Sequence, residues 1–306
     1  MTAAQVQSQI KAGQSLQGAE LSNIDLQQAN LDHGQFEQAY LRFANLTGAS
    51  CHCANFKQAT LMLATLNGAS FQEATFCQAL LNAAHLEGTS LKSIYATGMK
   101  LTKTKLNSSD FSNAILEQPN LEWASGQAVC FRDAILMKAN LTSVQLPNAD
   151  FRGAKLNDAI LKGAELENAN LSGASLERCI GPQANLSAAD LSEADLISAH
   201  LSGAIFQASR FHHTSLDHAN SSQTDLSGAQ IEETSLYSTN LEGANLAGAN
   251  LTGTDLREAN LERTNLTDVD FSNCSVAGAV FTNATGLSTE QKQLLERRRA
   301  LNIPKG

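Results

Sequence analysis

Large apolar residues recur every five positions along almost the whole chain, a period that fits neither an α-helix nor a half-buried strand. Such a residue, here called the centre, falls at every residue number ending in 1 or 6 from Leu16 to Phe281. This makes 54 consecutive pentapeptides without an insertion, and Leu or Phe occupies 47 of the centres. The exceptions are Cys51, Ala96, Gly126, Gly181, Ser221, Ile231 and Val276. A small residue stands two positions before nearly every centre, and the other three positions are mostly polar. A fixed short period of this kind predicts a repeat architecture.

The repeated pattern A-[DN]-[LF]-x-x resembles the pentapeptide-repeat family over about residues 14–285. The resemblance implies an all-β solenoid, a right-handed quadrilateral parallel β-helix of about 13 coils with twenty residues in each. The centre and the small residue would point inward, and the other three would face solvent. Strand is expected to dominate, with helix only at the two ends. Phenylalanine centres recur at twenty-residue spacing, which favours rings stacked from coil to coil. They are Phe36, Phe56 and Phe76, and then Phe111, Phe131 and Phe151.

The two ends of the chain depart from the repeat. Residues 1–13 predict an N-terminal capping helix with Thr2 as its N-cap. The repeat fills residues 14–285, and residues 286–306 predict a second helix, from a capping box at Ser288 to about Leu301, followed by a tail. This helix either caps the last coil, which is the preferred interpretation, or pairs with a second copy. Residues 92–130 are irregular, and Gly126 replaces a centre there. This irregularity predicts a bend or a bulge.

Composition narrows the class of protein further. The six cysteines form no CxxC pair, which favours reduced thiols and a cytoplasmic location. No apolar stretch approaches the roughly 20 residues that span a membrane, and the N-terminus lacks a secretory signal, so no membrane association is expected.

Residues 163–270 hold 16 acidic and four basic residues, a net charge of −12, whereas residues 1–162 are balanced. Because nucleic-acid binding needs basic stripes, we expect no nucleic-acid partner.

Motifs for catalysis, phosphate binding or paired zinc ligands are missing from the sequence. Residues twenty apart are expected to be neighbours, so His33, Cys53 and Glu73 would form one outward column. A second column would contain Glu193, His213 and Glu233. A straight column does not converge as a tetrahedral metal site requires, so a solvated ladder is the preferred interpretation of both. A regular solenoid also lacks the concave pocket that catalysis favours. We therefore expect no enzyme activity, no cofactor and no metal ligand.

Apolar side chains gather at outward positions of one predicted face, where polar residues are the rule. This apolar patch comprises Tyr40, Phe43, Met62, Leu63, Leu80 and Ala83, with Trp123 at its margin. Aromatic residues and Met are enriched in the cores of protein interfaces. We expect the patch to dock a protein partner or a second copy, unless the N-terminal helix folds back over it with Val6 and Ile10.

Two hypotheses for function follow. The first is a non-catalytic protein–protein interaction scaffold of the bacterial cytoplasm, for which the resemblance also implies a secretion-associated role. The alternative rests on relatives whose acidic rods imitate duplex DNA: a modulator or protector of gyrase, a type II topoisomerase. Residues 163–270 would make 5.4 coils spanning about 26 Å, over which duplex DNA carries roughly 15 charges. The acidic face of this alternative comprises Asp190, Glu193, Asp195, Asp225, Glu232, Glu233, Asp255 and Asp270.

Overall fold

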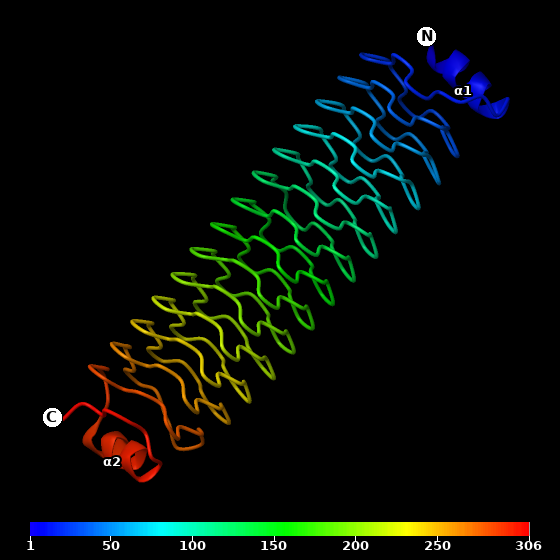
Figure 1. Ribbon diagram of the computed structural model, residues 1–306. Helices are drawn as coiled ribbons and strands as arrows, with labels where there is room; N and C mark the ends of the chain where they lie inside the picture. Colours follow the sequence, from blue (N-terminus) through cyan, green and yellow to red (C-terminus); the bar gives the residue numbers. More distant parts are fainter. Residues whose placement is uncertain (306) are drawn as a thin grey trace. The chain divides into compact units, whose positions relative to one another are not determined.

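The computed structural model describes residues 1–305. Helix α1 spans Ala3–Lys11 and helix α2 spans Thr289–Arg297, and the described residues contain no other helix. The chain divides into two compact units: unit 1 is Met1–Lys155, which begins with α1, and unit 2 starts at Leu156 and includes α2 (Figure 1). Nothing in the sequence predicts this division, because the five-residue register continues across residue 155.

Parallel bridges join residues twenty apart throughout each unit. Tyr40 pairs with Thr60 in unit 1, and Asn220 pairs with Asn240 in unit 2. Each bridged residue directly precedes a centre, and the N–H of the centre donates to a carbonyl one coil further on, as from Leu41 to Thr60 at 2.8 Å. Four pentapeptides therefore complete one coil, so residues 16–155 make seven coils and residues 156–285 make six and a half. The expected quadrilateral β-helix is confirmed, and Figure 1 shows the coils stacked within each unit.

Extended strands do not form in residues 1–305. Nearly every pentapeptide contributes one bridged residue, and a turn follows directly after the next centre. The expectation that strand would dominate is wrong, because the chain bends after every bridge and cannot continue in one direction. Backbone hydrogen bonds between coils nevertheless take up most backbone donors, so the repeat satisfies its polar groups without long strands.

The core of each unit is a narrow column of centres and small residues. The Phe36, Phe56 and Phe76 rings stack at centroid separations of 4.9 and 5.0 Å. The rings of Phe111, Phe131 and Phe151 stack at 4.9 and 5.0 Å as well. These six side chains are fully buried, so the predicted twenty-residue stacking of phenylalanines is confirmed.

The second residue after each centre is here called the corner, and it has a left-handed backbone after every centre except Phe271. Its φ angle is 63° at Gly153, 57° at Phe43 and 61° at Trp123. Glycine adopts this conformation without steric cost, which explains why glycines concentrate at corners. Corner side chains project outward and take little part in the core, so the fold tolerates many residue types there.

Three of the small centres, Gly126, Gly181 and Ser221, are accommodated in three different ways. At Gly126 the backbones of two coils approach closely, since an added Cβ would lie 2.7 Å from the carbonyl carbon of Leu106. At Gly181 an added Cβ would lie 3.3 Å from Leu201 Cδ2, a tight contact that the end of this flexible side chain can relieve by moving a few tenths of an ångström. At Ser221 a cavity of about 10 Å³ remains, and the buried Ser221 hydroxyl has no hydrogen-bond partner.

Residues 92–130 contain no bulge. Bridges continue without interruption from Tyr95–Ile115 through Asp110–Cys130, and the twenty-residue register is kept. The predicted bulge is wrong: the register is unbroken on both sides of Gly126, and the backbone of the preceding coil lies too close to Gly126 to leave room for a side chain there.

Helix α1 begins at the predicted N-cap, Thr2, and the structure adds a capping box there. The Thr2 hydroxyl accepts from the Gln5 N–H at 3.3 Å, and the Gln5 side chain accepts from the Thr2 N–H at 2.8 Å. Val6 is fully buried and Ile10 is half-buried. The apolar side of α1 therefore shields the N-terminal end of the core of unit 1, where an open solenoid would expose its first coil.

Helix α2 caps the last coil of unit 2. Its capping box at Ser288 is present, but the helix ends at Arg297 rather than near Leu301. The Arg298 guanidinium donates to backbone carbonyls of the last coil, at 3.0 Å to Phe271 and 2.7 Å to Cys274. Leu301 then forms a parallel bridge with Val280, so the chain after α2 returns to the sheet. This return explains why the helix is shorter than expected.

Candidate functional site

The predicted apolar patch forms a continuous surface on unit 1. The coil stacking brings the corners Phe43, Leu63 and Ala83 into one row, because the N–H of each corner donates to a carbonyl of the next coil. Tyr40 and Leu80 both bridge to Thr60, so they lie in a second row beside the first. Phe43 and Tyr40 are 51% and 49% exposed, and Leu63 is 42% exposed. The predicted residues are thus brought together, with Met62, Leu80 and Ala83 half-buried among them.

Helix α1 leaves the patch uncovered. Its one fully buried residue is Val6, while Tyr40, Phe43 and Leu63 keep about half of their surface in solvent. The alternative that the N-terminal helix hides the patch is therefore wrong, because α1 uses its apolar side to close the first coil.

Basic residues border the patch. The Arg42 guanidinium lies 5.8 Å from the centroid of the Phe43 ring. Lys100 bridges to Leu80, and Lys103 is the next corner after Ala83. Trp123 lies one coil beyond Lys103, and its indole N–H donates to Glu122 at 3.1 Å. Trp123 is therefore separated from the other residues of the patch by Lys100 and Lys103.

The eight predicted acidic residues do not form one face. Asp190, Glu193, Glu232, Glu233 and Asp270 belong to one set of stacked pentapeptides, Asp195 and Asp255 to a second, and Asp225 to a third. Within the first set, the coil of Arg210, His212 and His213 separates the acidic coils. The structure therefore distributes this negative charge over three faces of unit 2.

The five aspartates among the eight predicted acidic residues cap their own turns. Each carboxylate accepts from the N–H two residues later, as from Ser192 to Asp190 at 3.0 Å and from Ser227 to Asp225 at 3.0 Å. Asparagines at the same repeat position do likewise and also hydrogen-bond from coil to coil: Asn245 donates to Asp225 at 3.1 Å. From the sequence, the residue directly before each centre was expected only to face solvent. The recurrence of Asn and Asp at this position was the sequence signal for these turn-capping and coil-to-coil hydrogen bonds.

Hydrogen bonds shift the acidity of two of these aspartates. The hydrogen bond from the Arg257 side chain is the main cause that lowers the pKa of Asp255, and the Arg257 N–H and charge add to it. For Asp225, partial burial opposes ionisation, but hydrogen bonds from Ser227, Gln207 and Asn245 outweigh it and lower the pKa. Much of the negative charge is therefore engaged in holding turns and ladders.

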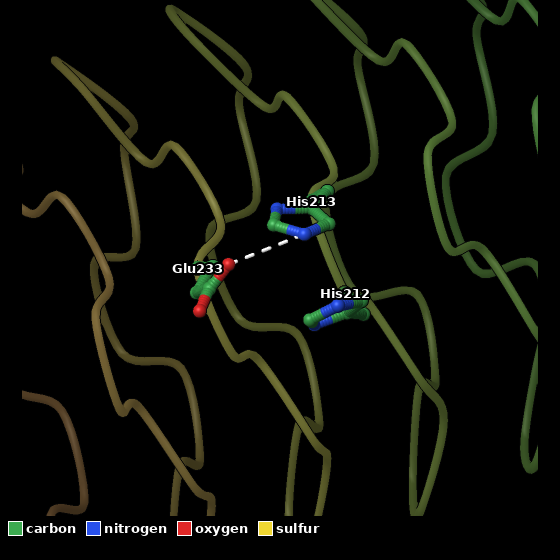
Figure 2. Close-up of side chains that lie close together, drawn as sticks. All are labelled: His212, His213 and Glu233. Carbon is green, nitrogen blue, oxygen red and sulfur yellow. Dashed lines mark ion pairs between the residues drawn. The ribbon is translucent and has the colours of Figure 1, made fainter.

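A histidine cluster on unit 2 joins His212 and His213 to Glu233, a member of the predicted acidic face (Figure 2). His213 Nε2 lies 3.2 Å from Glu233 Oε2, and the rings of His212 and His213 have centroids 4.0 Å apart. One ligand atom from each of these three residues lies within 4.8 Å of the others. In residues 1–305 no second group of His, Cys, Asp and Glu meets the same criterion, so His33, Cys53 and Glu73 do not converge.

The twenty-residue period predicts that His213 lies beside Glu233, but it does not predict the place of His212. The period relates only residues twenty apart, whereas the tight turn brings the side chains of two consecutive residues together. Glu193, the third member of the predicted column, is not part of the cluster.

The fold defines this protein as a repeat solenoid whose outward side chains are free to vary. A family model of pentapeptide repeats, in eight copies, matches the chain in overlapping segments that together cover residues 12–283. The chain belongs to the pentapeptide-repeat family. Proteins of this family fold as right-handed quadrilateral β-helices, so the expected hand is confirmed.

Three solved structures illustrate the likeness. HetL, a pentapeptide repeat protein involved in heterocyst differentiation regulation from the cyanobacterium Nostoc, is 29% identical; the match covers 70% of this chain and 90% of HetL, with a TM-score of 0.29. QnrB1, a plasmid-mediated fluoroquinolone resistance protein, is 20% identical over 57% of this chain and 97% of its own, with a TM-score of 0.39. A pentapeptide repeat protein from the Arabidopsis thaliana thylakoid lumen is 24% identical over 48% of this chain and 77% of its own, with a TM-score of 0.15.

No curated protein matches the sequence significantly. Neither helix in residues 1–305 has the length and apolar character that crossing a membrane requires.

Proposed function

We propose that this protein is a non-catalytic interaction scaffold of the bacterial cytoplasm and that its apolar patch docks a partner protein. The observation that carries the proposal is the pair Phe43 and Leu63, about half exposed at successive corners beside Tyr40. Contiguous exposed apolar residues with aromatics and Met at their centre are typical of protein interfaces.

Folding gives no reason for these side chains. Phe43 and Leu63 have φ angles of 57° and 60°, a conformation that is strained for bulky residues. An L-residue in this region costs about 1–2 kcal/mol relative to its right-handed conformation. Gly and Asn avoid this cost and stand at many other corners of the chain, such as Gly48 and Asn113. Most corners of the chain carry Gly or a polar residue, so the large apolar side chains at these two corners are the exception that contact with a partner would account for.

The partner is expected to present an apolar segment flanked by acidic residues. Arg42, Lys100 and Lys103 border the patch and would attract such flanks. Opposite charges at the rim of an interface mainly raise the association rate and fix orientation, whereas the apolar centre provides most of the affinity.

The test begins with partner identification through the patch itself. A photo-crosslinking amino acid replaces Phe43 in cells that produce the protein, and the same amino acid at the corner Asn113 serves as the control. The protein captured only from Phe43 is then purified. Its dissociation constant is measured by calorimetry for the unmodified chain, for Phe43→Asn with Leu63→Asn, and for Ile180→Thr with Ile205→Thr.

We expect the Phe43 and Leu63 double variant to weaken binding at least tenfold. The Ile180 and Ile205 double variant removes two exposed apolar side chains outside the patch and should change affinity less than twofold. Equal affinity for all three proteins would overturn the proposal. Capture of a second copy alone, with the unmodified chain a dimer and the patch variant a monomer in scattering, would also overturn it in favour of self-association.

The charge of unit 2 supports a second candidate function, imitation of duplex DNA toward gyrase. The net charge of −12 over residues 163–270 is close to that of DNA of similar length, roughly 15. Purified protein would then inhibit gyrase supercoiling or protect gyrase from quinolones at micromolar concentration. No effect in either assay would exclude this candidate without affecting the proposal for the patch.

A further inference from the structure

The histidine cluster of unit 2 joins two neighbouring coils. His212 and His213 are consecutive residues of one turn, and Glu233 is the corner one coil further on. We propose that His212, His213 and Glu233 bind a divalent transition-metal ion such as Zn²⁺. This proposal replaces the expectation from the sequence that the chain has no metal ligand.

The distances fit such an ion after small side-chain movements. Zn²⁺ binds imidazole nitrogen and carboxylate oxygen at about 2.0–2.2 Å, so two ligands of a tetrahedral site lie about 3.4 Å apart. His213 Nε2 and Glu233 Oε2 already lie 3.2 Å apart. The ligand atoms of all three residues lie within 4.8 Å of one another, and the side chains of His213 and Glu233 are more than half exposed. Rotation of exposed side chains can therefore close the remaining gap without a change in the coil.

The environment of His212 offers the support that a metal-binding histidine needs. Its Nδ1 is inaccessible to solvent and has no hydrogen-bond partner. Glu232 Oε2 lies 4.0 Å from this nitrogen. A histidine that binds a metal through one nitrogen commonly donates the other N–H to a carboxylate, which fixes the ring. Binding of a metal through His212 Nε2 would place Nδ1–H where Glu232 can accept it.

The donor set selects the class of metal. Two imidazoles and one carboxylate suit Zn²⁺, Cu²⁺, Ni²⁺ and Co²⁺, whereas Ca²⁺ and Mg²⁺ prefer oxygen ligands. The net charge of −12 over residues 163–270 favours a cation at this surface. Arg210 opposes it, because it lines the same surface hollow as His212 and Glu232. Three protein ligands leave at least one coordination position for water or another molecule.

The test is calorimetric titration of ZnCl₂ into the untagged full-length protein at pH 7.5, with a phosphine reductant that keeps the thiols reduced. His213→Asn and Glu233→Gln each remove one ligand while keeping a residue suited to the corner. His218→Asn is the matched control, because His218 is also a corner of unit 2 but Ser238 follows it one coil later. Co²⁺ absorption spectra report the coordination geometry independently.

We expect one Zn²⁺ per chain, with at least a tenfold loss of affinity in His213→Asn and in Glu233→Gln and no change in His218→Asn. The visible absorption of bound Co²⁺ should disappear in the same two variants. The absence of saturable binding would overturn the proposal. Binding that persists in both ligand variants would overturn it too, since the ion would then be held elsewhere, for example by the accessible thiol of Cys53.

Discussion

The corners of units 1 and 2 have the same left-handed backbone conformation but carry different side chains. Three successive coils of unit 1 carry Phe43, Leu63 and Ala83 at their corners, with φ angles of 56° to 60°. The corners after Leu201, Ser221 and Leu241 in unit 2 have φ angles of 59° to 69° and are occupied by Gly203, Gln223 and Gly243. The repeat therefore determines the backbone conformation of a corner but does not determine which side chain it carries.

The glycine corners of unit 2 agree with what the left-handed backbone favours, and the large apolar corners of unit 1 do not. A residue that folding does not favour is better explained by function than by stability. Substitutions at buried centres and at exposed corners should therefore change the free energy of unfolding by different amounts.

The largest effect is expected at a buried centre of unit 1. Phe56 is fully buried and its ring stacks on both Phe36 and Phe76. Phe56→Ala should lower the free energy of unfolding by about 3–5 kcal/mol, because it removes a core side chain and its ring contacts. Chemical denaturation measures the change. A loss below about 1 kcal/mol would show that centres and corners do not differ as described here.

Larger side chains at the small centres should change the stability of the two units in opposite directions. Ser221→Leu fills the cavity and removes an unpaired hydroxyl, so it should stabilise unit 2 by about 2 kcal/mol. Gly126→Ala in unit 1 should destabilise by about 1–3 kcal/mol, because its Cβ would clash with the backbone at Leu106. Gly181→Ala, whose Cβ requires only a slight shift of the flexible Leu201 side chain, is the control and should change stability by less than about 0.5 kcal/mol. Equal responses to all three substitutions in thermal unfolding would contradict the packing described here.

The sequence was sufficient to predict the fold because one period determines it. The five-residue register specifies the centres, the twenty-residue recurrence of phenylalanine indicates four pentapeptides per coil, and Ser288 marks the start of α2. The expected bulge near Gly126 could not be judged from the pattern, because only the backbone position shows whether a missing side chain leaves a void.

The site was predicted less completely. The apolar patch followed from stacking alone, since its members are aligned by the period. The turn-capping role of the aspartates was missed because the pattern does not show which outward residues accept from the backbone, as Asp255 does from Arg257. His212 was missed because its contact with His213 depends on ring orientation within one turn.

A smaller effect is expected from pH on the aspartates of unit 2. The pKa of Asp255 is lowered in the folded protein, chiefly by the Arg257 side chain. A lowered folded-state pKa contributes stability that is present above the unfolded pKa of about 4 and is lost as pH falls through the folded value. The unfolding free energy of the unmodified chain should therefore exceed that of Asp255→Asn at pH 6, and the difference should shrink below about pH 4. A difference independent of pH would contradict the assigned role of this carboxylate.

The most direct test of the central claim, that the apolar patch serves binding and not folding, is the unfolding free energy of the Phe43→Asn, Leu63→Asn double variant. Asparagine tolerates the left-handed corner, and this gain should offset the partial burial that the two side chains lose. We predict a change of less than about 1 kcal/mol relative to the unmodified chain by chemical denaturation. A loss of more than about 2 kcal/mol would contradict the claim, because the patch would then belong to the folding of unit 1.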